Sequence, residues 1–198
     1  MRSKKFLTLF ALILINLVSI NYSYSIEPDV FVQSTVNRAS EALNNKFTKE
    51  EKIEKLKQIA SETVDIKGIG FYTLGAYRKK ITDNQIKQYE TLFEKYFLKS
   101  FSSRLAEYSN PEIEVLSKEK LNQNYTMVSS ILVATEQRPA VKIDWRIYTK
   151  NSKNPLIRDL IIEGLSLART QKEEFASIIQ SSDGNINALF KTLEEFIK

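Results

Sequence analysis

The first half of the chain carries apolar residues at helical spacing. Between residues 28 and 43, apolar side chains recur every three or four positions and therefore share one face of a helix. Thr48 followed by Glu51 has the spacing of a capping box, which predicts that a second helix begins there. Residues 65–77 keep the helical period although they include three glycines, so we expect a helix whose backbone another group approaches closely.

The longest helix follows this glycine-rich segment. Thr82 and Gln85 form another capping box, and the helical period then continues from Asp83 to about Tyr108. Pro111 ends the helical half of the chain. The apolar stripe of the long helix includes three phenylalanines spaced four residues apart: Phe93, Phe97 and Phe101.

The pattern then changes to that of β-strands. Four segments rich in β-branched and aromatic residues are separated by turn-forming residues, at 112–117, 125–135, 140–149 and 156–167. A short polar loop at 151–155 predicts that the last two strands pair as an antiparallel hairpin. The third strand alternates most clearly, and its apolar residues point to one face: Val141, Ile143, Trp145 and Ile147. The fourth strand is apolar on both faces, which predicts cover from both sides.

Helical spacing returns at the C-terminal end. Thr170 and Glu173 predict a third capping box, Gly184 interrupts the period, and apolar residues from Leu189 to Ile197 line a final helix. The order of helices, strands and helices predicts an α+β domain, in which a curved antiparallel sheet of about four strands packs with N-terminal and C-terminal helices.

The N-terminus has the three parts of a secretory signal. Arg2, Lys4 and Lys5 precede an uncharged, mostly apolar run of 13 residues at 6–18, and small residues follow at 23–25. An uncleaved membrane anchor is the alternative, but the run is shorter than the ~20 residues that span a bilayer. We expect residues 1–25 to be a cleavable signal peptide and residues 26–198 to form a single domain.

Composition narrows the classes of function. Without the three basic residues of the signal, 26 basic and 24 acidic residues remain, and they are interspersed, which is not typical of a nucleic-acid-binding face. The chain has no cysteine and no histidine, so it lacks the commonest general base, the usual metal ligands and any disulfide. We expect neither a metal nor a cofactor, and catalysis would have to use carboxylates, Tyr, Lys or Arg.

Two polar motifs leave alternatives open. The glycines at 68, 70 and 75 lack the Gly-Lys-Ser/Thr sequence and the preceding strand of the phosphate-binding loops, so close packing explains them better. Asp144 and Arg146 share one strand face, and Glu163 on the next strand could join them. They form either an ion-paired polar face, an orienting or docking group, or a catalytic pair that moves protons without histidine. Lysines 79, 80, 87, 95 and 99 are interpreted as solvated helix surface, with partner docking as the alternative.

Three segments resemble the MlaC-type periplasmic phospholipid-binding proteins, also known as the toluene-tolerance auxiliary family. Residues 64–77 (VDIKGIGFYTLGAY) are similar to the family's segment that ends in Leu-Gly-x-Tyr or Trp. Residues 141–148 (VKIDWRIY) resemble its V-x-V-D-W-R strand, and residues 162–175 (IEGLSLARTQKEEF) resemble its most specific motif, with Lys172 at a usual arginine. The loop at 151–155 departs from the family, because it replaces the usual Asp-Gly turn.

The resemblance implies a nuclear-transport-factor-2-like cone that encloses the acyl chains of one glycerophospholipid, with the head group near solvent. It also implies a periplasmic carrier, without a catalytic residue, that exchanges lipid with an inner-membrane ABC transporter complex and an outer-membrane lipoprotein–porin complex. We expect a monomer whose lipid is cargo rather than a cofactor. The alternative is an enzyme on the same fold that uses Asp144, Arg146 and a tyrosine on a small hydrophobic substrate. The residues predicted to contact lipid are Ile69, Tyr72, Leu74, Tyr77, Phe93, Phe97, Phe101, Ile131, Val141, Ile143 and Trp145.

Overall fold

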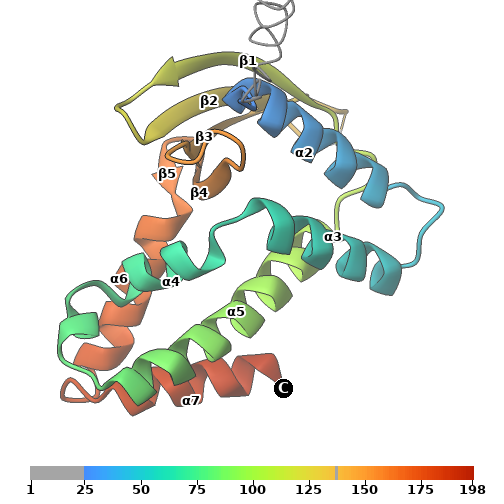
Figure 1. Cartoon of the computed structure of the whole chain (residues 1–198). Coiled ribbons are helices and arrows are strands. Elements are labelled where there is room, and N and C mark those ends of the chain that lie inside the picture. Colours follow the sequence, from blue (N-terminus) through green and yellow to red (C-terminus); the bar gives the residue numbers. More distant parts are fainter. Residues whose placement is uncertain (1–24, 137) are drawn as a thin grey trace, which may run out of the picture.

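The protein is an α+β domain with helices before and after one sheet (Figure 1). The computed structural model describes residues 25–136 and 138–198, so the predicted signal peptide lies outside them except for Ser25. The elements are, in order, α2 (Pro28–Ala42), α3 (Lys49–Thr63), α4 (Ile66–Leu74), the 3₁₀ turn η1 (Gly75–Lys79), α5 (Asp83–Leu105), β1 (Ile113–Lys120), β2 (Tyr125–Leu132), β3 (Val141–Tyr148), β4 (Leu156–Ile162), β5 (Leu165–Ser166), α6 (Leu167–Gln180) and α7 (Ile186–Ile197). None of the helices in these described ranges has the length and hydrophobicity needed to cross a bilayer.

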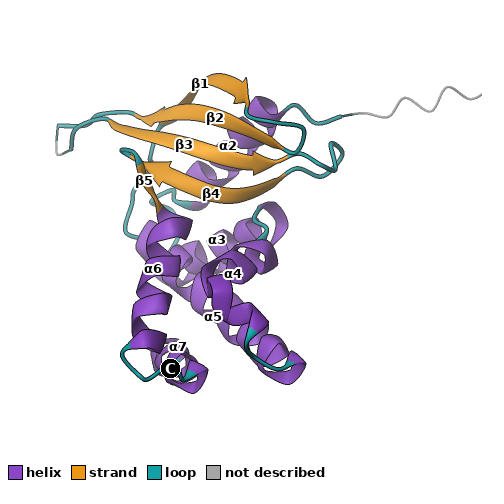
Figure 2. Cartoon of the chain, turned by 90° about the vertical axis from the view of Figure 1, so that its left-hand side faces the viewer, coloured by secondary structure: helices purple, strands orange, loops and turns teal. Residues whose placement is uncertain are grey.

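The sheet is a simple antiparallel meander in the order β1-β2-β3-β4-β5 (Figure 2). Trp145 on β3 lies opposite Val128 on β2, and directly opposed residues share a face. We call the face with Val128, Trp145 and Ile147 the inner face, because all three are buried in the main core. The opposite face, with Met127 and Arg146, is the outer face. The predicted alternation of the third strand is confirmed by this register.

The sheet has five strands rather than the predicted four. The segment predicted as one strand at 156–167 reverses direction at Glu163 and Gly164, which have positive φ angles of 49° and 83°. Two consecutive residues with positive φ make the tight turn that suits a two-residue hairpin. The chain therefore returns as the short strand β5, which pairs with the end of β4. The hairpin predicted around residues 151–155 is confirmed, and no residue of β4 is exposed.

Most predicted helices are confirmed, with corrections at their ends. The capping boxes at Thr48 and Thr82 are both formed. The one predicted at Thr170 is wrong, because α6 begins one turn earlier with Ser166 as its N-cap, and the Thr170 hydroxyl donates back to the Ser166 carbonyl at 3.1 Å. Gly75 lies outside the helix interior: its φ of 55° ends α4 and starts η1. The long helix ends at Leu105, three residues before the predicted end.

Helices cover the sheet in two places. Helix α2 packs against β1 and β2, and its Val32 and Val36 belong to the same buried cluster as Val128 and Trp145. Helices α3 to α7 gather beyond the β4–β5 edge of the sheet (Figures 1 and 2). The chain entering α4 joins that edge directly, since Val64 forms a parallel bridge with Ile157 of β4. This arrangement places α4 and α6 in a corner beside the sheet.

Candidate functional site

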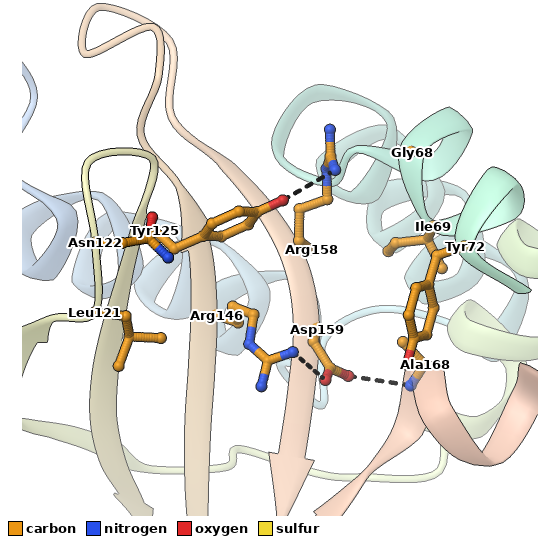
Figure 3. Close-up of a pocket in the computed structure, with 10 residues that line it drawn as sticks. All are labelled: Gly68, Ile69, Tyr72, Leu121, Asn122, Tyr125, Arg146, Arg158, Asp159 and Ala168. Carbon is orange, nitrogen blue, oxygen red and sulfur yellow. Dashed lines mark hydrogen bonds and ion pairs between the residues drawn. The ribbon is translucent and has the colours of Figure 1, made fainter.

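A cavity of about 400 Å³ lies in the corner between the sheet, α4 and α6 (Figure 3). We call it the sheet cavity. Its walls come from α4, from the loop between β1 and β2, from the outer face of β2 and β3, from β4, and from the start of α6. The lining residues are Gly68, Ile69, Tyr72, Leu121, Asn122, Tyr125, Arg146, Arg158, Asp159 and Ala168. The cavity therefore combines apolar walls with two arginines and one carboxylate.

Arg158 joins the sheet to α4. It is the extra residue of a β-bulge, because Ile147 pairs with Ile157 while Arg146 pairs with Asp159. The Arg158 Nε donates to the Asp65 carboxylate, its Nη1 lies 3.2 Å from the Tyr125 hydroxyl, and its guanidinium lies over the Tyr148 ring at 4.4 Å. Asp65 in turn caps α4, since its Oδ1 accepts from the Gly68 N–H at 2.8 Å. A bulge residue of β4 thus holds the first turn of α4 through one carboxylate.

The ion pair between Arg158 and Asp65 leaves room only for glycine at residue 68. A Cβ atom added to Gly68 would lie 2.5 Å from the Asp65 Oδ2 and 2.7 Å from the Arg158 Cζ. Both separations are too short for real contacts, so any larger residue at 68 displaces the ion pair. This close approach fulfils the sequence-based expectation that another group comes near the backbone of the glycine-rich helix.

Asp159, the next residue along β4, holds the first turn of α6. Its carboxylate is buried, and its two oxygens accept from the Ser166 hydroxyl at 2.6 Å and from the Ala168 N–H at 3.0 Å. A carboxylate at a helix N-terminus interacts favourably with the helix dipole. The Arg146 Nη1 lies 3.6 Å from the Asp159 Oδ2, which places a second guanidinium in the same corner.

The two arginines retain hydrogen-bond donors, whereas the two carboxylates are fully engaged. Both oxygens of Asp65 and both of Asp159 accept hydrogen bonds. Within the described residues, the guanidinium of Arg146 has only the long ion pair to Asp159, and five N–H groups are available to an arginine side chain. The polar end of the cavity therefore offers donors to an anionic oxygen, and phosphate and carboxylate match an arginine best.

A second cavity of about 410 Å³ lies on the other side of α4. We call it the helix cavity. It is lined by α3, α4, α5 and the loop after β3, with Phe71, Tyr89 and Phe93 among its walls. Tyr89 is buried, its hydroxyl lies 2.8 Å from the Thr73 Oγ1, and burial raises the pKa of its phenol well above the usual value. Helix α4 is thus a partition only one helix thick between two cavities of similar size.

Gly70 keeps the partition thin on its α5 side. A Cβ atom at Gly70 would lie 2.9 Å from the Phe93 ring. Phe93 is buried and stacks on Tyr89, with ring centroids 5.6 Å apart. Phe93, the first member of the aromatic ladder, therefore packs directly on the backbone of α4 and lines the helix cavity.

The residues predicted to contact lipid fall into three groups in this structure. Ile69 and Tyr72 line the sheet cavity, and Phe93 lines the helix cavity. Six others belong to the main core or pack against it: Leu74, Tyr77, Phe97, Phe101, Ile143 and Trp145. Ile131 and Val141 are half-buried near the far end of the β2–β3 ladder. That these eleven residues contact lipid, and not only one another in the core, stays a prediction.

The residues of the enzymatic alternative do not meet as one group. The Asp144 carboxylate accepts from the Ser129 hydroxyl at 2.6 Å and pairs with the Lys142 ammonium at 3.0 Å. Arg146 pairs with Asp159 instead, and the Glu163 carboxylate accepts from the Lys142 backbone N–H. Of the interpretations left open for this face, the ion-paired polar face describes the geometry that is observed. Across residues 25–136 and 138–198, no cluster of three or more acidic side chains is placed to hold a metal ion.

Sequence reasoning missed Arg158, Asp159 and Tyr125. The signal that could have identified the first two is the adjacent Arg-Asp pair inside an otherwise apolar strand, since charges in such a strand are usually paired. Tyr125 begins β2 and carried no distinguishing pattern, because its role depends on the bulge that turns Arg158 toward it.

Comparison with known proteins agrees with this architecture. Among solved structures, a phospholipid-binding protein from Ralstonia solanacearum, determined in complex with a phospholipid, has a similar fold, with a TM-score of 0.73. The two proteins share 18% sequence identity over 87% of this chain and 97% of that chain, so the similarity is one of fold. Residues 33–195 match the family described as MlaC protein, and this match extends over the three segments whose motifs resembled that family. The chain therefore belongs to the MlaC family.

Proposed function

We propose that this protein is a periplasmic phospholipid carrier. The observation that carries the proposal is the sheet cavity, which combines apolar walls with two arginines. Both arginines have N–H groups that are not used in the contacts described above. A phospholipid has the same two-part chemistry, with a phosphodiester beside long acyl chains. Family membership and the lipid-bound structure from Ralstonia support the assignment. The predicted signal peptide supports a location outside the cytoplasm.

In this proposal the phosphodiester binds at the polar end of the sheet cavity. Arg146 and Arg158 donate to its oxygens, and the half-exposed position of Arg146 leaves the rest of the head group near solvent. The acyl chains extend past Ile69 and Tyr72 toward the apolar core. Arg146 and Arg158 therefore select the anionic group, while the apolar wall accepts the acyl chains.

Two acyl chains need more room than either cavity provides. At about 400 Å³, the sheet cavity is near the lower limit for small-molecule sites. The helix cavity adds a similar volume and is separated from it only by α4. We expect α4 to move when lipid enters, so that the two cavities join and part of the predicted aromatic set becomes lipid-facing.

The energetics suit a carrier that works without catalysis. Removing about 30 CH₂ groups from water is worth roughly 0.8 kcal/mol each, a gross ~24 kcal/mol, which exceeds the practical limit of non-covalent affinity. Opening the core must offset part of this energy. Release into water would still be very slow, whereas transfer into another apolar environment is nearly neutral in free energy. Exchange therefore requires a docked partner, for which we propose an inner-membrane ABC transporter complex and an outer-membrane lipoprotein–porin complex.

Native mass spectrometry of residues 26–198, followed by lipid extraction, tests the binding step. We expect a mass increment equal to one glycerophospholipid. Arg146→Gln should lower retention of lipid about 10- to 100-fold, because a hydrogen bond to a charged group is worth roughly 1.5–3 kcal/mol. Lys95→Gln changes an exposed residue of α5 that lines neither cavity, and it is the matched control. A protein that stays free of lipid after incubation with phospholipid vesicles and detergent exchange would overturn the proposal.

The exchange step needs a separate experiment. Lipid carrying a fluorescent acyl chain, loaded on the protein, should move to proteoliposomes that contain either membrane complex and should remain on the protein with empty proteoliposomes. Equal transfer to both kinds of proteoliposome would show that neither complex is needed. Conversion of the lipid to another compound during the assay would favour the enzymatic alternative.

A further inference from the structure

The end of the molecule remote from the sheet carries a group of cations that form no ion pair with a carboxylate of the described residues. The segment from Lys67 to Thr82 contains four basic residues and no acidic one. It leads through η1 into the turn before α5, at the lower left of Figure 1. Lys172 of α6 reaches the same place, because its Cε lies 3.0 Å from the position of a Cβ on Gly75. We call Arg78, Lys79, Lys80 and Lys172 the cationic tip.

These four cations differ from the basic surface groups that form ion pairs across the fold. Elsewhere, long-range ion pairs engage Arg38, Lys49, Lys67 and Lys118. Within the described part of the chain, no residue of the cationic tip forms an ion pair, and Arg78, Lys79 and Lys80 are exposed. The acids nearest to them in sequence are Asp83, Glu173 and Glu174, and among the described residues none of these forms an ion pair with the four cations. The Glu174 Oε2 accepts instead from the Gln171 amide at 2.9 Å. The tip thus presents unneutralised positive charge to solvent.

Two tyrosine rings lie beside cations of the tip. The Lys172 ammonium lies 5.1 Å from the centroid of the Tyr72 ring, and the Lys80 ammonium lies 5.6 Å from that of Tyr77. Tyr72 is 43% exposed and also lines the sheet cavity, so the tip is continuous with the cavity wall. Tyrosine and lysine together are typical of surfaces that lie at a membrane–water interface, where the ring enters the head-group layer and the ammonium contacts phosphate.

We propose that the cationic tip docks on the surface of an anionic phospholipid bilayer. Each lysine or arginine near an anionic bilayer contributes about 1 kcal/mol of attraction, so a cluster of three or four such residues binds it measurably. Salt screens this attraction. An acidic protein is the other class of partner with complementary charge. The bilayer fits better, because the tip joins interfacial tyrosines to a cavity wall. The docking step stands on the surface alone, whereas its use in lipid exchange depends on the proposed function.

Vesicle flotation of residues 26–198 tests this proposal. The probes are vesicles of phosphatidylcholine alone and vesicles with three parts phosphatidylglycerol to seven parts phosphatidylcholine. We expect binding to the anionic vesicles only, and loss of that binding when NaCl is raised from about 0.05 M to about 0.5 M, where the Debye length falls severalfold. The triple variant Arg78→Gln, Lys79→Gln, Lys80→Gln should bind the anionic vesicles on the order of 100-fold more weakly.

The control removes the same charge elsewhere. Lys95→Gln, Lys150→Gln and Lys153→Gln change three exposed lysines outside the tip, and this variant should bind within about threefold of the unaltered protein. An equal loss in both triple variants would show a nonspecific charge effect and would overturn the proposal. Unchanged vesicle binding by the tip variant, with reduced binding to a membrane complex in detergent, would assign the surface to a protein partner instead. Circular dichroism should show both variants folded, because all six side chains are exposed.

Measurement of bound lipid in the same samples separates this proposal from the proposed function. A protein that binds anionic vesicles but never carries lipid would refute the carrier and leave the docking surface in place. A protein that carries lipid but binds both kinds of vesicle equally poorly would refute the docking surface and leave the carrier in place.

Discussion

Gly68→Ala should destabilise the protein even though alanine is the better helix former. Within a helix, replacing glycine by alanine is worth about 1 kcal/mol in favour of folding. The new Cβ would however lie 2.5 Å from the Asp65 Oδ2 and 2.7 Å from the Arg158 Cζ, so the ion pair between them must move. The Asp65 side chain is 17% exposed and that of Arg158 is 28% exposed, both under one third, so water replaces their interaction poorly.

The expected magnitude follows from what the displaced pair loses. A hydrogen bond to a charged group contributes roughly 1.5–3 kcal/mol, and the cap on the Gly68 N–H adds about 1 kcal/mol. After the gain in helix propensity is subtracted, the free energy of unfolding should fall by about 1.5–3 kcal/mol. For a domain of this size, that corresponds to a Tm lower by about 3–12 °C. Thermal unfolding of residues 26–198, followed by circular dichroism at 222 nm, measures it.

A double-mutant cycle tests the cause. In an Arg158→Ala background the ion pair is absent and only the contact of the new Cβ with the Asp65 Oδ2 remains. Loss of the Asp65 cap then roughly offsets the gain in helix propensity, so Gly68→Ala should be close to neutral. Gly70→Ala is the matched control on the same helix, because its new Cβ meets the Phe93 ring and not Arg158. Its effect should be the same in both backgrounds. If Gly68→Ala destabilises both backgrounds equally, the ion pair between Arg158 and Asp65 does not explain why glycine is needed at residue 68.

Three further predictions concern the buried polar groups. Ser130→Ala removes the hydrogen-bond acceptor 2.8 Å from the Trp145 Nε1, and the unpaired indole N–H should lower the free energy of unfolding by about 1–3 kcal/mol. Urea unfolding followed by the fluorescence of this single tryptophan measures the change. No change would mean that another group or water accepts the N–H. Asp159→Asn removes the negative charge at the first turn of α6 and should destabilise the fold by about 2 kcal/mol without changing its helical content, and a loss below about 0.5 kcal/mol would contradict the capping role. Burial raises the pKa of Tyr89, so above pH 10 the unfolded chain releases a proton that the folded chain keeps, and stability should fall by about 1.4 kcal/mol for each pH unit until the folded phenol also ionises. Tyr89→Phe should abolish this part of the pH dependence, and an unchanged slope would show that other groups cause it.

Periodicity predicted the elements of this fold well, because their burial is one-sided and local. The capping boxes at Thr48 and Thr82 and the alternation of β3 depend on residues a few positions apart, and all were confirmed. The start of α6 was missed because Ser166 competes with Thr170 as a cap, and the deciding contact is the Asp159 carboxylate seven residues earlier than Ser166. The division of the last predicted strand depends on a positive φ at Glu163, which is uncommon for that residue type.

The candidate site was less accessible to sequence reasoning than the fold. Apolar stripes mark residues that leave water, but they do not distinguish a wall of a cavity from a filled core. Ile69 and Trp145 have similar patterns and equal exposure, yet only Ile69 reaches the sheet cavity, since Trp145 points to the inner face. The polar end depends on a one-residue bulge in β4, and a bulge changes the direction of a side chain without leaving a periodic signal.

The bulge in β4 has a mechanical consequence. Arg158 and Asp159 are consecutive residues, and they hold the first turns of α4 and α6, the two helices beside the sheet cavity. We therefore expect a local change in the twist of this one strand to shift the first turns of both helices together, so that the two walls of the cavity move as a coupled pair. Because α4 leads through Gly75 and η1 to the cationic tip, we expect a shift of its first turn to change the position of the tip relative to the sheet.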